Sequence, residues 1–229
     1  YFGGIFDGGD HTIVVSIDVE GASAIQKSYA GVFGCLSGAM VKNLLVTGSV
    51  SASSLTSNSS NTSLAGGICG YAYRSTIINC ANTCDVSSQS KYKSSDDVRE
   101  VDCAGGICGL AKESTINFCY NTGDIAAYNF TSNSDYSNIT PIAGGVCGNM
   151  TATTVSFSYN TGRVTAQSTY YNEGSSAGGI CGYSHGKIVK SSLVYSRINY
   201  CYNTGSIISE LSSGLSYSKP FFAGGICGW

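Results

Sequence analysis

The sequence predicts an all-β fold, a parallel β-helix of about six coils, and two repeated tracts carry that prediction. One tract, mostly Ile-x-x-Cys-Tyr-Asn-Thr-Gly-x-Ile, occurs at 77–86, 116–125, 155–164 and 198–207. Repeats with a period of roughly 20–50 residues are typical of solenoids. Glycine interrupts every segment and none has a helical hydrophobic stripe, so short strands are expected. The other tract is Ala-Gly-Gly-Ile/Val-Cys-Gly, and its copies begin at Ala65, Ala104, Ala143, Ala177 and Ala223.

We expect residues 1–229 to form a single solenoid domain that is part of a longer chain or of a polymer. The Gly-Gly tract predicts a tight turn, and the Ile-x-x-Cys-Tyr tract predicts a strand. A further strand follows and continues into a polar excursion of variable length, which predicts loops on one side of the scaffold. An insertion around 187–195 lengthens the last interval between Gly-Gly tracts. The coils begin near Tyr1, Gly31, Gly66, Gly105, Gly144, Gly178 and Gly224.

Alignment of the coils predicts which residues stack on one another. Stacked asparagines at a turn can hydrogen-bond to the coils above and below, so such a ladder is structural. The predicted asparagine ladder contains Asn82, Asn121, Asn160 and Asn203. A buried aliphatic column is predicted from Val41, Ile77, Ile116, Val155 and Ile198.

The eleven cysteines predict disulfides within coils. In the first coil Phe33 and Leu44 replace both repeated cysteines together, which suggests that the two cysteine columns are neighbours. A reduced ladder and bonds between coils remain open as alternatives, because stacked cysteines also fall within disulfide distance. Cys84 and Cys103 bracket a charged excursion, and a disulfide between them would close that loop. The predicted within-coil pairs are Cys69–Cys80, Cys108–Cys119 and Cys181–Cys201.

Composition points to an extracellular or cell-surface location. Eleven cysteines and five Asn-x-Ser/Thr sequons favour an oxidising compartment and a glycoprotein. With 11% charged residues and a net charge of -2, the chain has no basic stripe for nucleic acid. No stretch predicts a membrane-spanning helix, so membrane insertion is not expected. The candidate glycosylation sites are Asn58, Asn61, Asn129, Asn138 and Asn149.

Residues for chemistry are sparse, and we predict no catalytic residue, metal site or cofactor. Zinc sites favour closely spaced cysteine pairs, usually with histidine, whereas this chain has no Cys-x-x-Cys and only His11 and His185. The pectin-degrading β-helix hydrolases resemble one another in an Asn-Thr-Asp motif. This chain has Asn-Thr-Gly-Asp at 121–124, with glycine at the position of the first aspartate.

The repeats resemble the GLUG-type repeats of microbial cell-surface proteins. Residues 6–13, Phe-Asp-Gly-Gly-Asp-His-Thr-Ile, are similar to the Phe-Asp-Gly-x-Gly-His-Thr-Ile start of that family. The Ala-Gly-Gly-Ile-Cys-Gly tract at 65–70 is similar to its Gly-Gly-Leu-Val-Gly core, although the cysteine departs from it. The resemblance implies a right-handed β-solenoid in secreted or surface-anchored proteins, often adhesins or stalks. It implies no catalytic residue.

These observations predict a structural or adhesive protein, a solenoid segment of a surface fibre, stalk or filament. Open coil ends expose unpaired strand edges, so continuation of the same chain or head-to-tail self-association is expected. The alternative is a β-helix that binds or degrades polysaccharides. In that case Tyr170 and Tyr171 would stack on surface glycans, and Asp96 and Asp97 would bind a cation or substrate.

Overall fold

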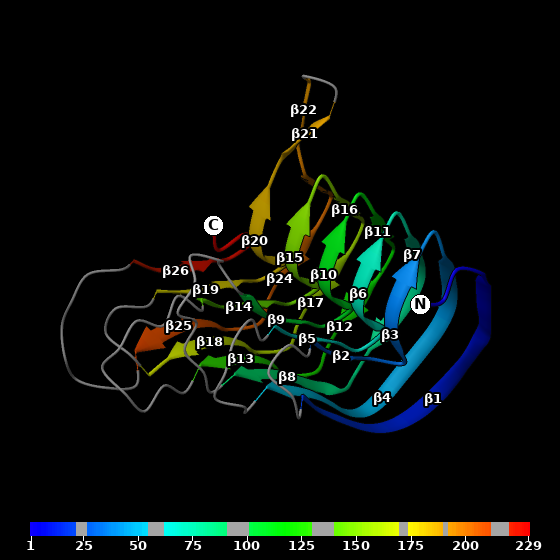
Figure 1. Ribbon diagram of the computed structural model, residues 1–229, viewed down its shortest axis with the longest axis horizontal. Helices are drawn as coiled ribbons and strands as arrows, with labels where there is room; N and C mark the ends of the chain where they lie inside the picture. Colours follow the sequence, from blue (N-terminus) through cyan, green and yellow to red (C-terminus); the bar gives the residue numbers. More distant parts are fainter. Residues whose placement is uncertain are drawn as a thin grey trace.

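The computed structural model describes residues 1–21, 27–54, 62–90, 101–129, 140–169, 174–189, 192–211 and 220–229. In these residues the chain forms strands and turns and no helix, and the strands stack in parallel along one axis (Figure 1). The all-β parallel solenoid predicted from the sequence is therefore confirmed. None of the described segments is a helix that could cross a membrane.

Three parallel sheets form the sides of the solenoid, and a hairpin adds a fourth, two-stranded sheet. The thirteen-stranded sheet contains β1 (Ile5–Gly21), β4 (Met40–Ser54), β7 (Thr76–Asn82), β8 (Asp85–Ser90), β11 (Thr115–Asn117), β12 (Tyr120–Asn121), β13 (Ile125–Asn129), β16 (Thr154–Ser156), β17 (Tyr159–Asn160), β18 (Val164–Ser168), β23 (Arg197–Asn199), β24 (Tyr202–Asn203) and β25 (Ile207–Leu211). The six-stranded sheet contains β2 (Ser28–Ala30), β5 (Ser63–Gly66), β9 (Val101–Gly105), β14 (Thr140–Gly144), β19 (Ser175–Gly178) and β26 (Phe221–Gly224). The five-stranded sheet contains β3 (Phe33–Ser37), β6 (Cys69–Tyr73), β10 (Cys108–Lys112), β15 (Cys147–Thr151) and β20 (Cys181–His185).

Each turn passes through the thirteen-, six- and five-stranded sheets in that order, and each strand pairs with its copy in the next turn. Four turns, which begin at β4, β7, β11 and β16, lie between neighbours on both sides. The segments before β4 and after β22 form the end turns. The solenoid therefore has about four enclosed turns, slightly fewer than the six coils that the sequence predicted.

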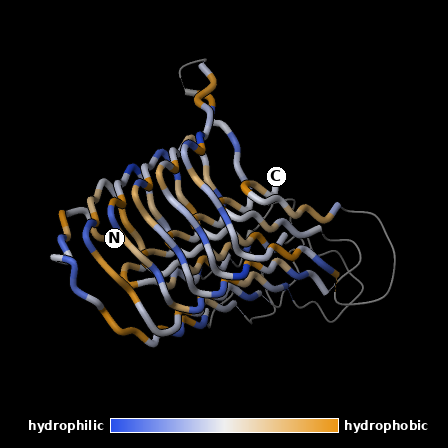
Figure 2. Tube along the Cα trace, turned by 180° about the vertical axis from the view of Figure 1, so that it is seen from behind, coloured by the Kyte–Doolittle hydropathy of each residue, from blue (hydrophilic) through white to orange (hydrophobic). Residues whose placement is uncertain are grey.

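The core consists of columns of small and aliphatic side chains that point inward from the three sheets. The aliphatic column predicted from the sequence forms in register, since Ile77 pairs with Val41 and Ile116, and Val155 pairs with Ile116 and Ile198. Its members from Val41 to Val155 are fully buried. Burying one such side chain contributes about 1.5–3 kcal/mol, so stacking supplies the main stabilisation. Figure 2 traces these successive turns from behind.

A second, smaller cluster lies between the six- and five-stranded sheets, on the faces that point away from the main core. Leu64, Cys103, Leu110 and Ile142 are buried there, and Tyr29, Tyr71 and Tyr183 pack against them. Alternation along each strand explains this division. In β9, for example, Cys103 points into the second cluster and Ala104 into the main core.

The insertion predicted around 187–195 forms an antiparallel hairpin of β21 (Lys187–Val189) and β22 (Ser192–Val194). The hairpin projects from the stacked turns beyond β20 (Figure 1). Its side chains Ile188, Leu193 and Val194 are exposed, so it adds nothing to the solenoid core.

Candidate functional site

The asparagine ladder forms as a continuous chain of side-chain amides. Asn82 Nδ2 donates to Asn121 Oδ1, and Asn121 Nδ2 donates to Asn160 Oδ1, both at 2.7 Å. Asn160 Nδ2 donates to Asn203 Oδ1 at 2.8 Å. Each amide also donates to a carbonyl two residues ahead, as Asn121 does to Gly123 O at 2.7 Å. The ladder therefore satisfies buried polar groups and joins four successive turns.

The second glycine of four of the five Gly-Gly tracts makes room for this ladder. A Cβ at Gly106 would lie 2.4 Å from Asn121 Cγ and 2.2 Å from Gly145 O. Gly145 and Gly179 stand in the same relation to Asn160 and Asn203. The Gly-Gly and Asn-Thr-Gly tracts recur together because the glycine of one tract, which has no side chain, packs against the buried asparagine amide of the other.

The cysteines stack in columns and stay unbonded. Cys69, Cys108 and Cys147 are neighbours in register in the five-stranded sheet, and Phe33 occupies the same column in the first turn. Leu44 likewise pairs with Cys80. Cys69 Sγ lies 3.4 Å from Cys108 Sγ in the next turn. The Cys108 thiol donates a hydrogen bond to Leu110 O in its own turn, at 3.3 Å.

The predicted within-coil disulfides Cys69–Cys80, Cys108–Cys119 and Cys181–Cys201 are therefore wrong, since all eleven cysteines are free thiols. The physical reason is that the sulfur contact at Cys69 runs along its column, to Cys108 of the next turn, not across the coil. The predicted Cys84–Cys103 pair is also absent, because Cys84 packs in the main core and Cys103 in the second cluster. The arrangement is the reduced ladder that the sequence left open.

Burial controls the chemistry of these thiols. It raises the pKa of Cys103 and Cys108 well above the ordinary value, because a buried thiolate would lose its hydration. At the last turn, a hydrogen bond with Cys181 lowers the pKa of the partly exposed Cys227 to about 7. Thiolate is the reactive form, so buried thiols with a raised pKa, such as Cys103 and Cys108, are inert, and Cys227, which combines exposure with a lowered pKa, is the most reactive position.

Two of the five predicted glycosylation sites are unsuitable. Asn149 is 5% exposed in β15, and Asn129 is fully buried at the end of β13. Neither side chain could carry a glycan in the folded solenoid, so these two predictions are wrong. Asn58, Asn61 and Asn138 lie outside the described residues, as do Asp96, Asp97, Tyr170 and Tyr171.

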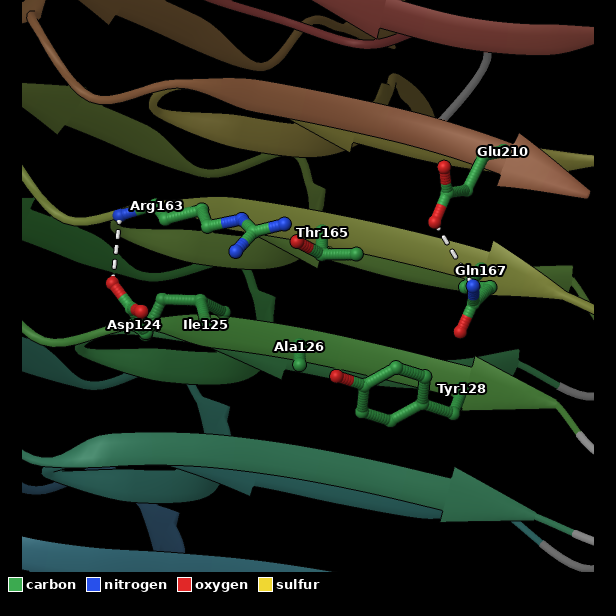
Figure 3. Close-up of a pocket in the computed structure, with 8 residues that line it drawn as sticks. All are labelled: Asp124, Ile125, Ala126, Tyr128, Arg163, Thr165, Gln167 and Glu210. Carbon is green, nitrogen blue, oxygen red and sulfur yellow. Dashed lines mark hydrogen bonds between the residues drawn. The ribbon is translucent and has the colours of Figure 1, made fainter. Parts of the chain in front are cut away.

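A shallow basin lies on the outer face of β13, β18 and β25, and Figure 3 shows its lining. It encloses about 260 Å³. Asp124 Oδ1 accepts a hydrogen bond from the backbone N–H of Arg163 at 3.1 Å, and Gln167 Nε2 donates to Glu210 Oε1 at 2.9 Å. Its lining residues are Asp124, Ile125, Ala126, Tyr128, Arg163, Thr165, Gln167 and Glu210.

The two carboxylates of this basin are too far apart to act as a glycosidase pair. Glu210 belongs to β25, two strands from β13, and stands four positions further along the strand direction than Asp124. Strand spacings place the two positions roughly 15 Å apart. Glycoside hydrolysis uses carboxylates about 5–9.5 Å apart on either side of the bond. Asp124, the residue of the Asn-Thr-Gly-Asp tract, is instead held by the backbone of the next turn.

A column of left-handed residues crosses the outer surface beside the cysteines. The first three turns place Asp10, Asn43 and Asn79 there, with φ of 59°, 55° and 52°. The next three turns place Phe118, Phe157 and Tyr200 in the same column, with φ of 51°, 48° and 52°. Asparagine and aspartate tolerate this conformation, whereas it costs other L-residues about 1–2 kcal/mol each. The aromatic residues are therefore held against the preference of their backbone.

Two parallel aromatic ladders result. Phe118, Phe157 and Tyr200 stack with ring centroids 5.0 and 4.8 Å apart, and these residues are 52%, 47% and 80% exposed. The second ladder lies two residues further along each strand, and its centroids are 5.0 and 4.9 Å apart. Its members are Tyr120, Tyr159 and Tyr202.

These ladders were not predicted from the sequence. Asn-Phe-Cys-Tyr at 117–120, Ser-Phe-Ser-Tyr at 156–159 and Asn-Tyr-Cys-Tyr at 199–202 align, so the signal was present. Recognising it requires the knowledge that the residue before each Cys or Ser is left-handed and points outward. No group of three His, Cys, Asp or Glu side chains that could hold a metal ion occurs in the part of the chain that the structure describes.

Both end turns leave inward-pointing apolar side chains partly exposed. In β1, Ile13, Val15, Ile17 and Val19 pack against the core without full burial. At the other end, Ile198, Ile207 and Cys227 do the same. Their equivalents in the enclosed turns, such as Ile116 and Ile125, are buried on both sides.

Comparison with known proteins leaves the family open. No family model matches the chain, and no curated protein does, so the resemblance to GLUG-type repeats stays a prediction. Among solved structures, the chain is similar to a crystal structure described as a putative immunoglobulin A1 protease from Bacteroides ovatus. The two share 19% sequence identity with a TM-score of 0.48, over 97% of this chain and 68% of that one.

Proposed function

We propose that this chain is a non-catalytic structural module of an extracellular fibre, stalk or adhesin, and that its turns extend by further stacking. Further stacking means either more turns of the same chain or head-to-tail contact with another copy. This proposal rests on the observation that the residues repeated in four successive turns hold those turns together. The asparagine amides bond to one another, and the glycines pack against them.

The end turns support the stacking part of this proposal. Ile13 to Val19 in β1 present one open apolar surface, and Ile198 and Ile207 present the other. A further turn at either end would bury these side chains and pair the free strand edges. Contact between unlike ends does not close on itself, so identical copies would form filaments.

The sequons support the extracellular location, and the free cysteines do not exclude it. Buried thiols with raised pKa values resist oxidation, so the interior cysteines are compatible with an oxidising compartment. Asn58, Asn61 and Asn138 remain the candidate glycosylation sites.

A polysaccharide-degrading function is less well supported. The carboxylates of the outer basin, Asp124 and Glu210, are separated too widely, and each is hydrogen-bonded to its neighbour. We expect the purified protein to release neither unsaturated nor reducing ends from acidic polysaccharides, with or without Ca²⁺. Release of either product would remove the non-catalytic part of the proposal.

Head-to-tail stacking is tested by light scattering over a range of protein concentrations. Wild type should grow in mass as concentration rises. The Val15→Lys variant places a charge on the inward face of the end strand, and it should stay a monomer. Ser16→Lys is the matched control. The Ser16 side chain neighbours Val15 and points outward, so this variant should associate as wild type does. A wild type that stays monomeric at millimolar concentration, or a Val15→Lys variant that associates normally, would contradict stacking of copies.

A further inference from the structure

We propose that the two aromatic ladders form a binding surface for a short, neutral stretch of polysaccharide. This inference is independent of head-to-tail stacking, because the ladders lie on the outer side of β11, β12, β16, β17, β23 and β24. These strands stack along one face of the solenoid (Figure 1).

The fold does not require aromatic residues in this column, because residues that tolerate the left-handed conformation serve there as well. Asn43 and Asn79 fill the same left-handed column, and Asn79 Nδ2 donates to Asn43 Oδ1 at 2.8 Å. An amide ladder therefore suits this position without backbone strain. Phe118, Phe157 and Tyr200 replace it with a strained backbone and with aromatic residues that are 47–80% exposed. Strain at an exposed position that the core does not use points to a binding role.

The rings are arranged so that a ligand can reach them. Atoms in contact lie about 3.5–4.0 Å apart, which is less than the centroid distances of 4.8–5.0 Å. The rings therefore repeat at about the spacing of the strands, and they are not packed as closely as atoms in contact. Beyond the last ring of each ladder, Tyr200 and Tyr202 remain 80% and 53% exposed. The result is an exposed aromatic surface whose last members in each ladder are the most accessible.

The side chains that flank the two ladders indicate which class of ligand would bind. Uncharged side chains that form hydrogen bonds flank the rings on both sides. A surface with aromatic rings between hydroxyls and amides fits a ligand that alternates apolar C–H faces with hydroxyl groups, which describes a neutral sugar chain. A polyanion would need cations, and within the three turns that carry the rings these columns hold none; Lys42, in the column of Asn117, lies two turns away. The flanking residues are Asn117, Ser156 and Asn199 on one side and Thr122, Thr161 and Thr204 on the other.

The size of the surface argues against a protein partner or a second copy. Each ladder spans about 10 Å between its first and third ring. The two ladders are two residues apart along the strand, or roughly 7 Å. A stable protein interface buries about 800 Å² on each partner, far more than such a patch supplies. A few sugar rings fit this area.

The test measures binding of neutral hexasaccharides by calorimetry, with cellohexaose, chitohexaose and mannohexaose as probes and polygalacturonate as the anionic comparison. Wild type should bind at least one neutral probe saturably and bind it more tightly than polygalacturonate. The triple variant Phe118→Asn, Phe157→Asn, Tyr200→Asn copies the residue of the earlier turns, so it should keep the circular dichroism spectrum and lose at least tenfold in affinity.

The matched control is Ile188→Asn with Leu193→Asn, which removes exposed apolar side chains from the β21–β22 hairpin, and it should bind as wild type does. If the triple variant does not fold, Tyr200→Asn alone, in the most exposed ring, should weaken binding at least threefold. Three results would overturn the inference: no neutral probe binds at millimolar concentration, the folded ladder variants bind normally, or wild type forms a dimer that the ladder variant dissolves.

Discussion

Substitution of Asn121 by alanine tests the ladder that holds the turns together. The change removes three hydrogen bonds: one from Asn82 Nδ2, one to Asn160 Oδ1 and one to Gly123 O, each 2.7 Å long. A buried hydrogen bond contributes about 0.5–1.5 kcal/mol net, and each buried group left unpaired costs about 1–3 kcal/mol. Asn82 keeps its second bond, to Cys84 O. The expected loss in unfolding free energy is therefore about 3–5 kcal/mol.

The assay is equilibrium urea denaturation followed by circular dichroism, with Asn199→Ala as the matched control. Asn199 is an exposed asparagine on β23, and its removal should change stability by less than about 0.5 kcal/mol. A loss below about 1 kcal/mol for Asn121→Ala would refute the reasoning, because it would mean that the ladder contributes no more than a surface asparagine.

Three further predictions concern other features of the solenoid. Gly106→Ala should destabilise the fold at least as much as Asn121→Ala, because its Cβ would lie 2.2 Å from Gly145 O and 2.4 Å from Asn121 Cγ; a normal melting temperature would contradict this packing. Thiol titration of the native protein should label only the three partly exposed cysteines, Cys227 fastest, and should reach the eight buried ones only after unfolding; disulfides found by non-reducing peptide mapping would contradict the reduced ladder. The Asp7 carboxylate, hydrogen-bonded by Lys42, Asn43 and the Gly9 N–H, should titrate by NMR with a pKa of about 2, and Lys42→Ala should raise that pKa toward 3.8. Because the folded pKa lies below the unfolded value, this stabilisation is present above pH 4 or so and is lost as the pH falls through about 2; equal pH profiles for wild type and Lys42→Ala would contradict it.

The register of the solenoid was predictable because repeated residues align whenever coils stack. Val41, Ile77 and Ile116 were placed in one column from spacing alone, and the structure pairs them in that order. Asn82 and Asn121 followed from the same alignment. Alignment identifies neighbours along the axis, and it gives no distance across a coil. For that reason the within-coil disulfides were wrong, although the cysteine columns themselves were correctly recognised.

Features that depend on the direction of a side chain were harder to predict. A sequon motif does not reveal that Asn149 is buried, in register with Leu110 and Tyr183 of the second cluster. The aromatic ladders were missed for a related reason. Phe118 sits where a strand would be expected to continue, and only its left-handed backbone turns both Phe118 and Tyr120 outward around the buried Cys119.

Electron microscopy of the native, unreduced protein tests the central claim, that this solenoid is a structural module which extends by stacking. The account predicts continuous filaments whose axial repeat matches the height of the stacked turns, about 4.8 Å per turn and therefore roughly 30 Å per subunit. Isolated particles of that height at every concentration, with no longer parent chain, would contradict it.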